Sequence, residues 1–220
     1  MIIRNTFLMK RLAAFAFAAF VLCAAMPQIC LAQAEKKEPV TFTQKDRDAA
    51  IKRFAETQAN YANALKGLSM AQMNFKPNEK SWSVGQAAEH IMLSESLILN
   101  FIKQAMKTPV NENPGVFRVN DLAVTLAITN RQQKFNAPPA IQPKSESKSI
   151  EDLIAGFNKA RAVNVEILKT TKVDLRNHFS PNPLMGMIDA YQTFLFLNGH
   201  TERHLAQIAE IKANKDFPKN

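Results

Sequence analysis

The repeated spacing of apolar residues by three and four positions is the feature that most constrains the fold of this chain. It is clearest in residues 83–106, where eight apolar residues would share one face of a helix. No stretch of any length alternates apolar and polar residues as a half-buried strand does. The stretches with helical spacing are residues 43–66, 83–106, 149–169 and 183–211. The sequence therefore predicts an all-α domain, an antiparallel four-helix bundle with one extra short helix within residues 120–135.

Capping signals set the predicted helix boundaries. Capping-box spacing is found at Thr43 and Asp46, Ser83 and Gln86, and Ser149 and Asp152. Pro183 behind Asn182 predicts the first turn of the last helix, which would run through Ile211. Stretches marked by proline, residues 69–82, 107–118 and 136–148, are predicted as loops inside a single domain.

The first 34 residues have the pattern of a secretory signal peptide. A basic start is followed by the apolar run LAAFAFAAFVLCAAM (12–26) and by Ala32-Gln33-Ala34, which matches the A-x-A cleavage pattern. The alternative is an uncleaved membrane anchor, since residues 12–34 carry no charge, although proline and glutamine interrupt the second half of that run. We therefore expect an exported protein, periplasmic or extracellular, whose domain spans residues 35–220 without stable membrane insertion.

Removing the leader changes both the thiol content and the charge. The two cysteines, Cys23 and Cys30, lie in it, so the mature protein would have no thiol for catalysis or metal binding. Neither follows a small residue as a lipoprotein cysteine does. The leader carries three basic residues and no acidic one, so the net charge would fall from +9 to +6. The remaining basic residues alternate with acids and form no basic stripe, and nucleic-acid binding is not expected.

The histidines are the candidate functional residues. The chain has four, and His200 and His204 stand one helical turn apart in NGHTERHLAQI (198–208). They continue the apolar stripe of the last helix, which is formed by Phe194, Leu197, Ile208 and Ile211. His90 lies at the edge of the stripe of the second long helix and can face inward from there. Two interpretations are open. The histidines could be hydrogen-bonded core residues, or they could form a metal site built from facing helices, with three ligands and an open position.

The residues around these histidines resemble a known family. SWSVGQAAEHI (81–91) and NGHTERHLAQI together are similar to the DinB/YfiT-like superfamily, and the resemblance extends over residues 43–213. It implies a four-helix bundle with up-down-down-up connectivity, commonly a homodimer, which binds a divalent metal through His90, His200 and His204. Relatives include thiol S-transferases, a maleylpyruvate isomerase and metal-dependent hydrolases. Export makes thiol transfer a weaker expectation, because low-molecular-weight thiols are mainly cytoplasmic.

The sequence also predicts the roles or exposure of other residues, several of them close to these histidines. Gln207, three positions after His204, is the candidate for orienting a ligand or substrate. Glu89 and Glu202 are one step off the inward face and are predicted at the surface. His178 is predicted exposed in a loop, and Trp82 is predicted to staple the start of its helix. Core or dimer contacts are predicted for Met92, Met185, Met187, Phe194 and Phe196.

The leading hypothesis is an exported protein that binds one divalent transition metal and hydrolyses a small molecule or transfers a group to it. Zinc is the expected metal, with Ni²⁺, Fe²⁺ or Mn²⁺ as alternatives. The chain has no HExxH and no G-x-S-x-G motif, so neither a zincin glutamate nor a hydrolase serine is expected. The alternatives are a non-catalytic metal-binding or stress-response bundle, and a basic binder of membrane or nucleic-acid surfaces.

Overall fold

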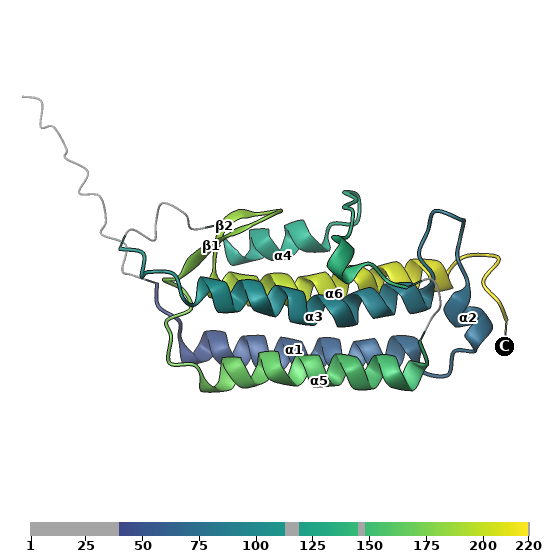
Figure 1. Cartoon of the computed structure of the whole chain (residues 1–220), viewed down its shortest axis with the longest axis horizontal. Coiled ribbons are helices and arrows are strands. Elements are labelled where there is room, and N and C mark those ends of the chain that lie inside the picture. The colour runs from purple at the N-terminus through teal and green to yellow at the C-terminus, as the bar shows by residue number, and fades with distance from the viewer. Residues whose placement is uncertain (1–39, 113–118, 145–147, 220) are drawn as a thin grey trace, which may run out of the picture. The chain divides into compact units, whose positions relative to one another are not determined.

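Four long helices form the body of the protein. The computed structural model describes residues 40–112, 119–144 and 148–219, so the predicted signal peptide lies outside the described residues. The long helices are α1 (Gln44–Leu65), α3 (Val84–Ala105), α5 (Ile150–Thr170) and α6 (Ala190–Lys212). In Figure 1, α1 and α6 run in one direction while α3 and α5 run in the other. The all-α bundle with up-down-down-up connectivity is therefore confirmed.

Each long helix packs against two others. α3 contacts α5 and α6, and α1 contacts the same two helices. The extra short helix α4 (Asp121–Thr129) packs on α6 and lies on the side of the bundle away from α1 and α5 (Figure 1). Within the described ranges, no helix is both long and apolar enough to cross a membrane.

The predicted helix starts are largely confirmed. Thr43 and Ser83 form capping boxes with Asp46 and Gln86, and Ser149 caps α5. The helix expected within residues 120–135 ends at Thr129, where Arg203 of α6 donates to the carbonyl oxygens of Ile128 and Asn130. Arg203 thereby satisfies carbonyls that a longer helix would have bonded internally.

The prediction that the last helix starts at Pro183 was wrong, as was the absence of strands. Residues around Pro183 form an antiparallel hairpin of β1 (Phe179–Asn182) and β2 (Gly186–Asp189). The Asn182 side chain accepts from the amides of Leu184 and Met185, so it caps a turn instead of a helix. Gly186 adopts φ +70°, which ends the turn. α6 begins after Asp189, which forms a capping box with Gln192.

Two further short elements lie in stretches predicted as loops. Ser69 and Gln72 form a capping box at the start of α2 (Met70–Asn74). The linker 136–148 contains the 3₁₀ turn η2 (Pro139–Ile141), which packs against α3. Both are shorter than the window over which helical spacing can be recognised in a sequence.

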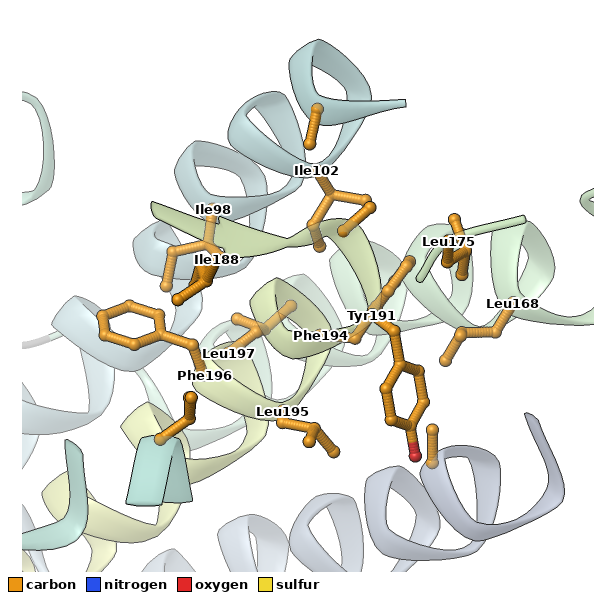
Figure 2. Packing of buried hydrophobic residues seen from close by; sticks show 14 of the residues in the cluster. Ile98, Ile102, Leu168, Leu175, Ile188, Tyr191, Phe194, Leu195, Phe196 and Leu197 are labelled. Atoms are coloured by element: carbon orange, nitrogen blue, oxygen red, sulfur yellow. The ribbon is translucent and has the colours of Figure 1, made fainter. Parts of the chain in front are cut away.

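The bundle has two apolar clusters with polar residues between them. One cluster lies at the hairpin end, where Ile188 of β2 packs with Ile98 and Ile102 of α3 and with Phe194 and Leu197 of α6 (Figure 2). The other includes residues at the opposite ends of the same helices. Between the two clusters each long helix carries buried polar residues, among them Thr57, Glu95, Arg161, Asn164, Asn198 and Thr201. His200 and His204 belong to this polar part of the bundle, and His90 lies beside it on α3, between Ala88 and Ile91 of the second cluster.

Candidate metal centre

Three of the four histidines meet inside the bundle. His90 projects from α3, and His200 and His204 project from successive turns of α6. One ring nitrogen from each lies within 4.8 Å of the others. The Nε2 atoms of His90 and His200 are 3.2 Å apart. The structure thus brings together the three residues that the sequence pattern singled out.

Hydrogen bonds on the far side of two rings decide which nitrogen faces the cluster. His90 Nδ1 lies 2.8 Å from the carbonyl oxygen of Ile141, which can only accept a hydrogen bond. His204 Nδ1 lies 2.8 Å from Gln207 Oε1 in the same arrangement. Both rings therefore carry their proton on Nδ1 and leave an Nε2 lone pair for the cluster. Gln207 holds His204 as the sequence analysis expected of an orienting residue.

His200 differs from the other two rings. Its Nδ1 is buried and has no hydrogen-bond partner among the described residues. Its Nε2 faces the Nε2 of His90. A buried imidazole nitrogen without a partner is costly unless a ligand uses the ring. An unpaired buried nitrogen of this kind is unusual for a core histidine, and a metal bound at Nε2 would leave it unpaired.

Burial keeps the cluster neutral. Exposed fractions are 3% for His90, 9% for His200 and 8% for His204. Loss of solvation lowers the pKa of His90, although its bond to Ile141 opposes this. Burial together with the nearby His90 ring lowers the pKa of His204 to about 3. Burial and the other two rings put the pKa of His200 well below its usual value. Neutral imidazole is the form that ligates a metal.

These shifts predict how the stability of the metal-free protein depends on pH. In the unfolded chain each ring binds a proton below about pH 6.5, whereas the folded pKa of His204 is about 3. The contribution of these neutral rings to the free energy of unfolding is therefore fully present above pH 6.5 and is lost progressively as the pH falls toward 3. Each such ring contributes a slope of up to about 1.4 kcal/mol per pH unit. Urea unfolding of metal-free protein at several pH values measures the slope, and a His200→Asn, His204→Asn variant should be flatter. Equal slopes would contradict the assignment.

The donor set fits a divalent transition metal. Tetrahedral zinc with Zn–N bonds near 2.05 Å places its nitrogen ligands about 3.3 Å apart, and the His90 and His200 Nε2 atoms are 3.2 Å apart. Within the described ranges, no carboxylate or thiol joins the three imidazoles in the cluster. Three neutral nitrogens with room for an exchangeable ligand are typical of catalytic sites, whereas structural sites use four protein ligands.

Trp82 forms one side of the cluster. Its ring centroid lies 4.7 Å from that of His90 and 6.0 Å from that of His204, and its side chain is half-buried. The indole packs on two of the three imidazoles, a role beyond the helix staple that the sequence predicted. It covers these two rings with apolar surface.

Three expectations about exposure were wrong. Glu89 is only 2% exposed, and its carboxylate accepts a hydrogen bond from the Lys144 amide. Glu202 is half-buried and pairs with Arg53 of α1 at 2.7 Å. His178 is half-buried, with Nδ1 2.6 Å from the Thr108 carbonyl oxygen. In each case a partner distant in sequence covers the side chain, and helical spacing carries no information about such partners. Phe194 and Phe196 are buried as predicted, while Met92, Met185 and Met187 are half-buried.

Comparison with known proteins identifies the family. The sequence model of the DinB superfamily matches residues 53–208, which include all three clustered histidines. The chain belongs to the DinB superfamily. It is also 24% identical over 160 residues to the uncharacterized protein YuaE of Bacillus subtilis (strain 168), covering 72% of this chain and 94% of that protein.

A solved structure has a fold similar to that of this chain. YfiT from Bacillus subtilis is described as a probable metal-dependent hydrolase with an unusual four-helix bundle topology. The match has a TM-score of 0.51 and 14% sequence identity and covers 80% of this chain and 91% of YfiT. At that identity the likeness concerns the fold.

Proposed function

We propose that this DinB-superfamily protein binds one divalent transition metal through His90, His200 and His204. It uses the metal to hydrolyse a small molecule or to transfer a group to it. The observation that carries the proposal is the set of three neutral imidazoles with no carboxylate or thiol among the described residues to complete it. Zinc is the first candidate, because neutral imidazole suits it and it prefers tetrahedral sites, while Ni²⁺, Fe²⁺ and Mn²⁺ remain alternatives.

The residues of the chain have distinct roles in this proposal. When bound, the metal supplies a Lewis acid for a water or substrate oxygen. Ile141 and Gln207 hold His90 and His204 with their Nε2 atoms toward the ion. Trp82 shields the rings from solvent on one side and strengthens electrostatic interactions there. No carboxylate of the described residues belongs to the cluster.

The experiment compares metal-stripped and reloaded protein on panels of esters, amides, phosphoesters and group acceptors. We expect turnover that a chelator abolishes, that Zn²⁺ or another divalent metal restores, and that His204→Ala lacks. The alternative is a non-catalytic metal-binding or stress-response protein. Cobalt-substituted protein whose visible spectrum does not change with azide or small thiols would indicate a closed site and favour that alternative.

The family resemblance and one surface support the proposal that the protein is a homodimer. The outer face of α4 is apolar, with Leu122 62% exposed and Leu126 59% exposed. Leu126→Glu is expected to convert a species of about twice the chain mass into a monomer in light scattering. Val163→Glu, at an exposed site on α5, is the matched control and should remain dimeric. A monomeric wild-type protein would contradict the proposal.

The N-terminal pattern supports the proposal that the protein is exported. Cleavage after Ala34 would leave a chain beginning at Glu35. Mass spectrometry of protein recovered from outside the cytoplasm is expected to show that N-terminus. A chain beginning at Met1 in the membrane fraction would instead indicate the uncleaved anchor.

A further inference from the structure

The segment 138–144, which we call the strap, is bound to α3 beside the metal centre. Three hydrogen bonds join them. His90 Nδ1 lies 2.8 Å from the Ile141 carbonyl oxygen, the Lys144 amide donates to Glu89 Oε2 at 2.8 Å, and Gln86 Nε2 donates to the Lys144 carbonyl oxygen at 3.0 Å. The strap therefore contacts the candidate metal ligand His90 directly, and it also contacts Gln86 and Glu89, which lie within about one helical turn of His90.

The strap has an ordered conformation of its own. Pro139 begins the 3₁₀ turn η2, and its ring fixes φ there. The Ile141 amide donates to the Pro138 carbonyl oxygen at 3.0 Å, and the Gln142 amide donates to Pro139 at 3.3 Å. The Ile141 side chain is 6% exposed. The direction of the Ile141 carbonyl is thus set by a local turn and by the two hydrogen bonds at Lys144.

We propose that Glu89 and Gln86 are positioning residues for the metal centre, acting through the strap. By holding Lys144 they keep the Ile141 carbonyl against His90 Nδ1. That bond selects the ring tautomer whose Nε2 lone pair faces His200 and His204. The inference rests on the proposed metal binding by these histidines, and it assigns a role to two residues outside the ligand set.

The burial of Glu89 and Gln86 supports this role. Glu89 is 2% exposed and Gln86 7% exposed. A carboxylate is rarely buried without a specific partner, and a partner of Glu89 is a backbone amide of the strap. Gln86 uses both ends of its amide group. Its Oε1 accepts from the Ser83 amide as part of the helix cap, while its Nε2 binds the strap.

Substitutions at two positions separate the contribution of the strap from that of the helix cap. Gln86→Glu keeps an oxygen for the Ser83 cap but replaces the donor to Lys144 with a second oxygen. Glu89→Gln keeps an oxygen acceptor for the Lys144 amide, whereas Glu89→Ala removes it. Glu166→Ala, an exposed glutamate on α5, is the matched control.

Zinc affinity and the His90 tautomer are the two readouts. Competition with a chromophoric chelator gives the affinity, and long-range ¹H–¹⁵N NMR of the metal-free protein gives the tautomer. We expect Glu89→Ala and Gln86→Glu to weaken zinc binding by about 10-fold or more and to populate both His90 tautomers. The zinc affinities of Glu89→Gln and Glu166→Ala should stay within about threefold of the wild-type value. That change is smaller than the loss expected when a residue that supports a metal ligand is removed.

The outcomes distinguish this inference from the proposed function. Suppose that the wild-type protein binds zinc, and that Glu89→Ala and Gln86→Glu bind it equally well with an unchanged His90 tautomer. The positioning role of the strap is then overturned, while the metal site stands. If wild-type protein binds no metal, the proposed function fails. The tautomer in metal-free Glu89→Ala then still decides whether the strap orients His90.

Discussion

Replacing Arg161 with alanine is expected to lower the free energy of unfolding by about 3–5 kcal/mol, because it leaves a buried carboxylate without its partner. Arg161 and Glu95 are both fully buried and form two hydrogen bonds, of 2.6 and 3.0 Å. The guanidinium also donates to the hydroxyls of Thr57 and Thr201 at 2.9 and 3.0 Å. Such a loss is a large fraction of the total stability of a domain, which is about 5–15 kcal/mol.

Two controls accompany this prediction. Arg53→Ala breaks the Arg53–Glu202 pair, whose side chains are 29% and 32% exposed, and should cost no more than about 1 kcal/mol. The double variant Arg161→Met, Glu95→Leu should lose less stability than Arg161→Ala alone, because neither charge remains buried. Urea denaturation measures all of these. A loss for Arg161→Ala as small as that for Arg53→Ala would contradict the assigned role of the buried pair.

Removing His204 is expected to abolish tight metal binding. Two imidazoles would remain, and the affinity should fall by more than the ~10–100-fold typical of losing a supporting group. The consequence can be measured as stability. Zinc at a thousand times its dissociation constant stabilises a folded protein by about 4 kcal/mol, so the wild-type melting temperature should rise clearly on zinc addition. That of His204→Ala should change little.

The fourth histidine provides the matched control for this experiment. His178 lies in the loop before β1, where Nδ1 contacts the Thr108 carbonyl oxygen, and it is not part of the cluster. His178→Ala should therefore keep the full zinc-dependent rise in melting temperature. An equal rise in wild type and His204→Ala would show that zinc binds elsewhere and that the cluster is not the site.

The long helices and the histidine cluster could be predicted because local signals determine them. Helical spacing marks the buried face of α3, and capping boxes at Thr43 and Ser83 mark helix starts. His200 and His204 stand one turn apart on a single helix, so their proximity follows from helix geometry alone. His90 could be placed near them once its helix was expected to pack against the last helix.

The remaining features depend on partners that spacing does not reveal. Asn182 and Pro183 are equally suited to a helix start and to a hairpin turn, and Gly186 decides for the turn through its positive φ. Helical spacing puts Glu89 one step off the inward face and so predicts it at the surface. Its burial depends instead on the strap, over fifty residues away in the chain. Arg161 occupies an inward position of α5 that the apolar pattern skips, and its burial follows from Glu95 on another helix.

Elemental analysis of the purified protein beside a His200→Ala, His204→Ala variant tests the central claim most directly. Our account predicts about one equivalent of a transition metal per chain in the wild type, as expected for a three-histidine site, and little in the variant. A wild-type protein that is metal-free, and that takes up neither Zn²⁺ nor Ni²⁺ on reconstitution, would contradict it. The three histidines would then be buried core residues.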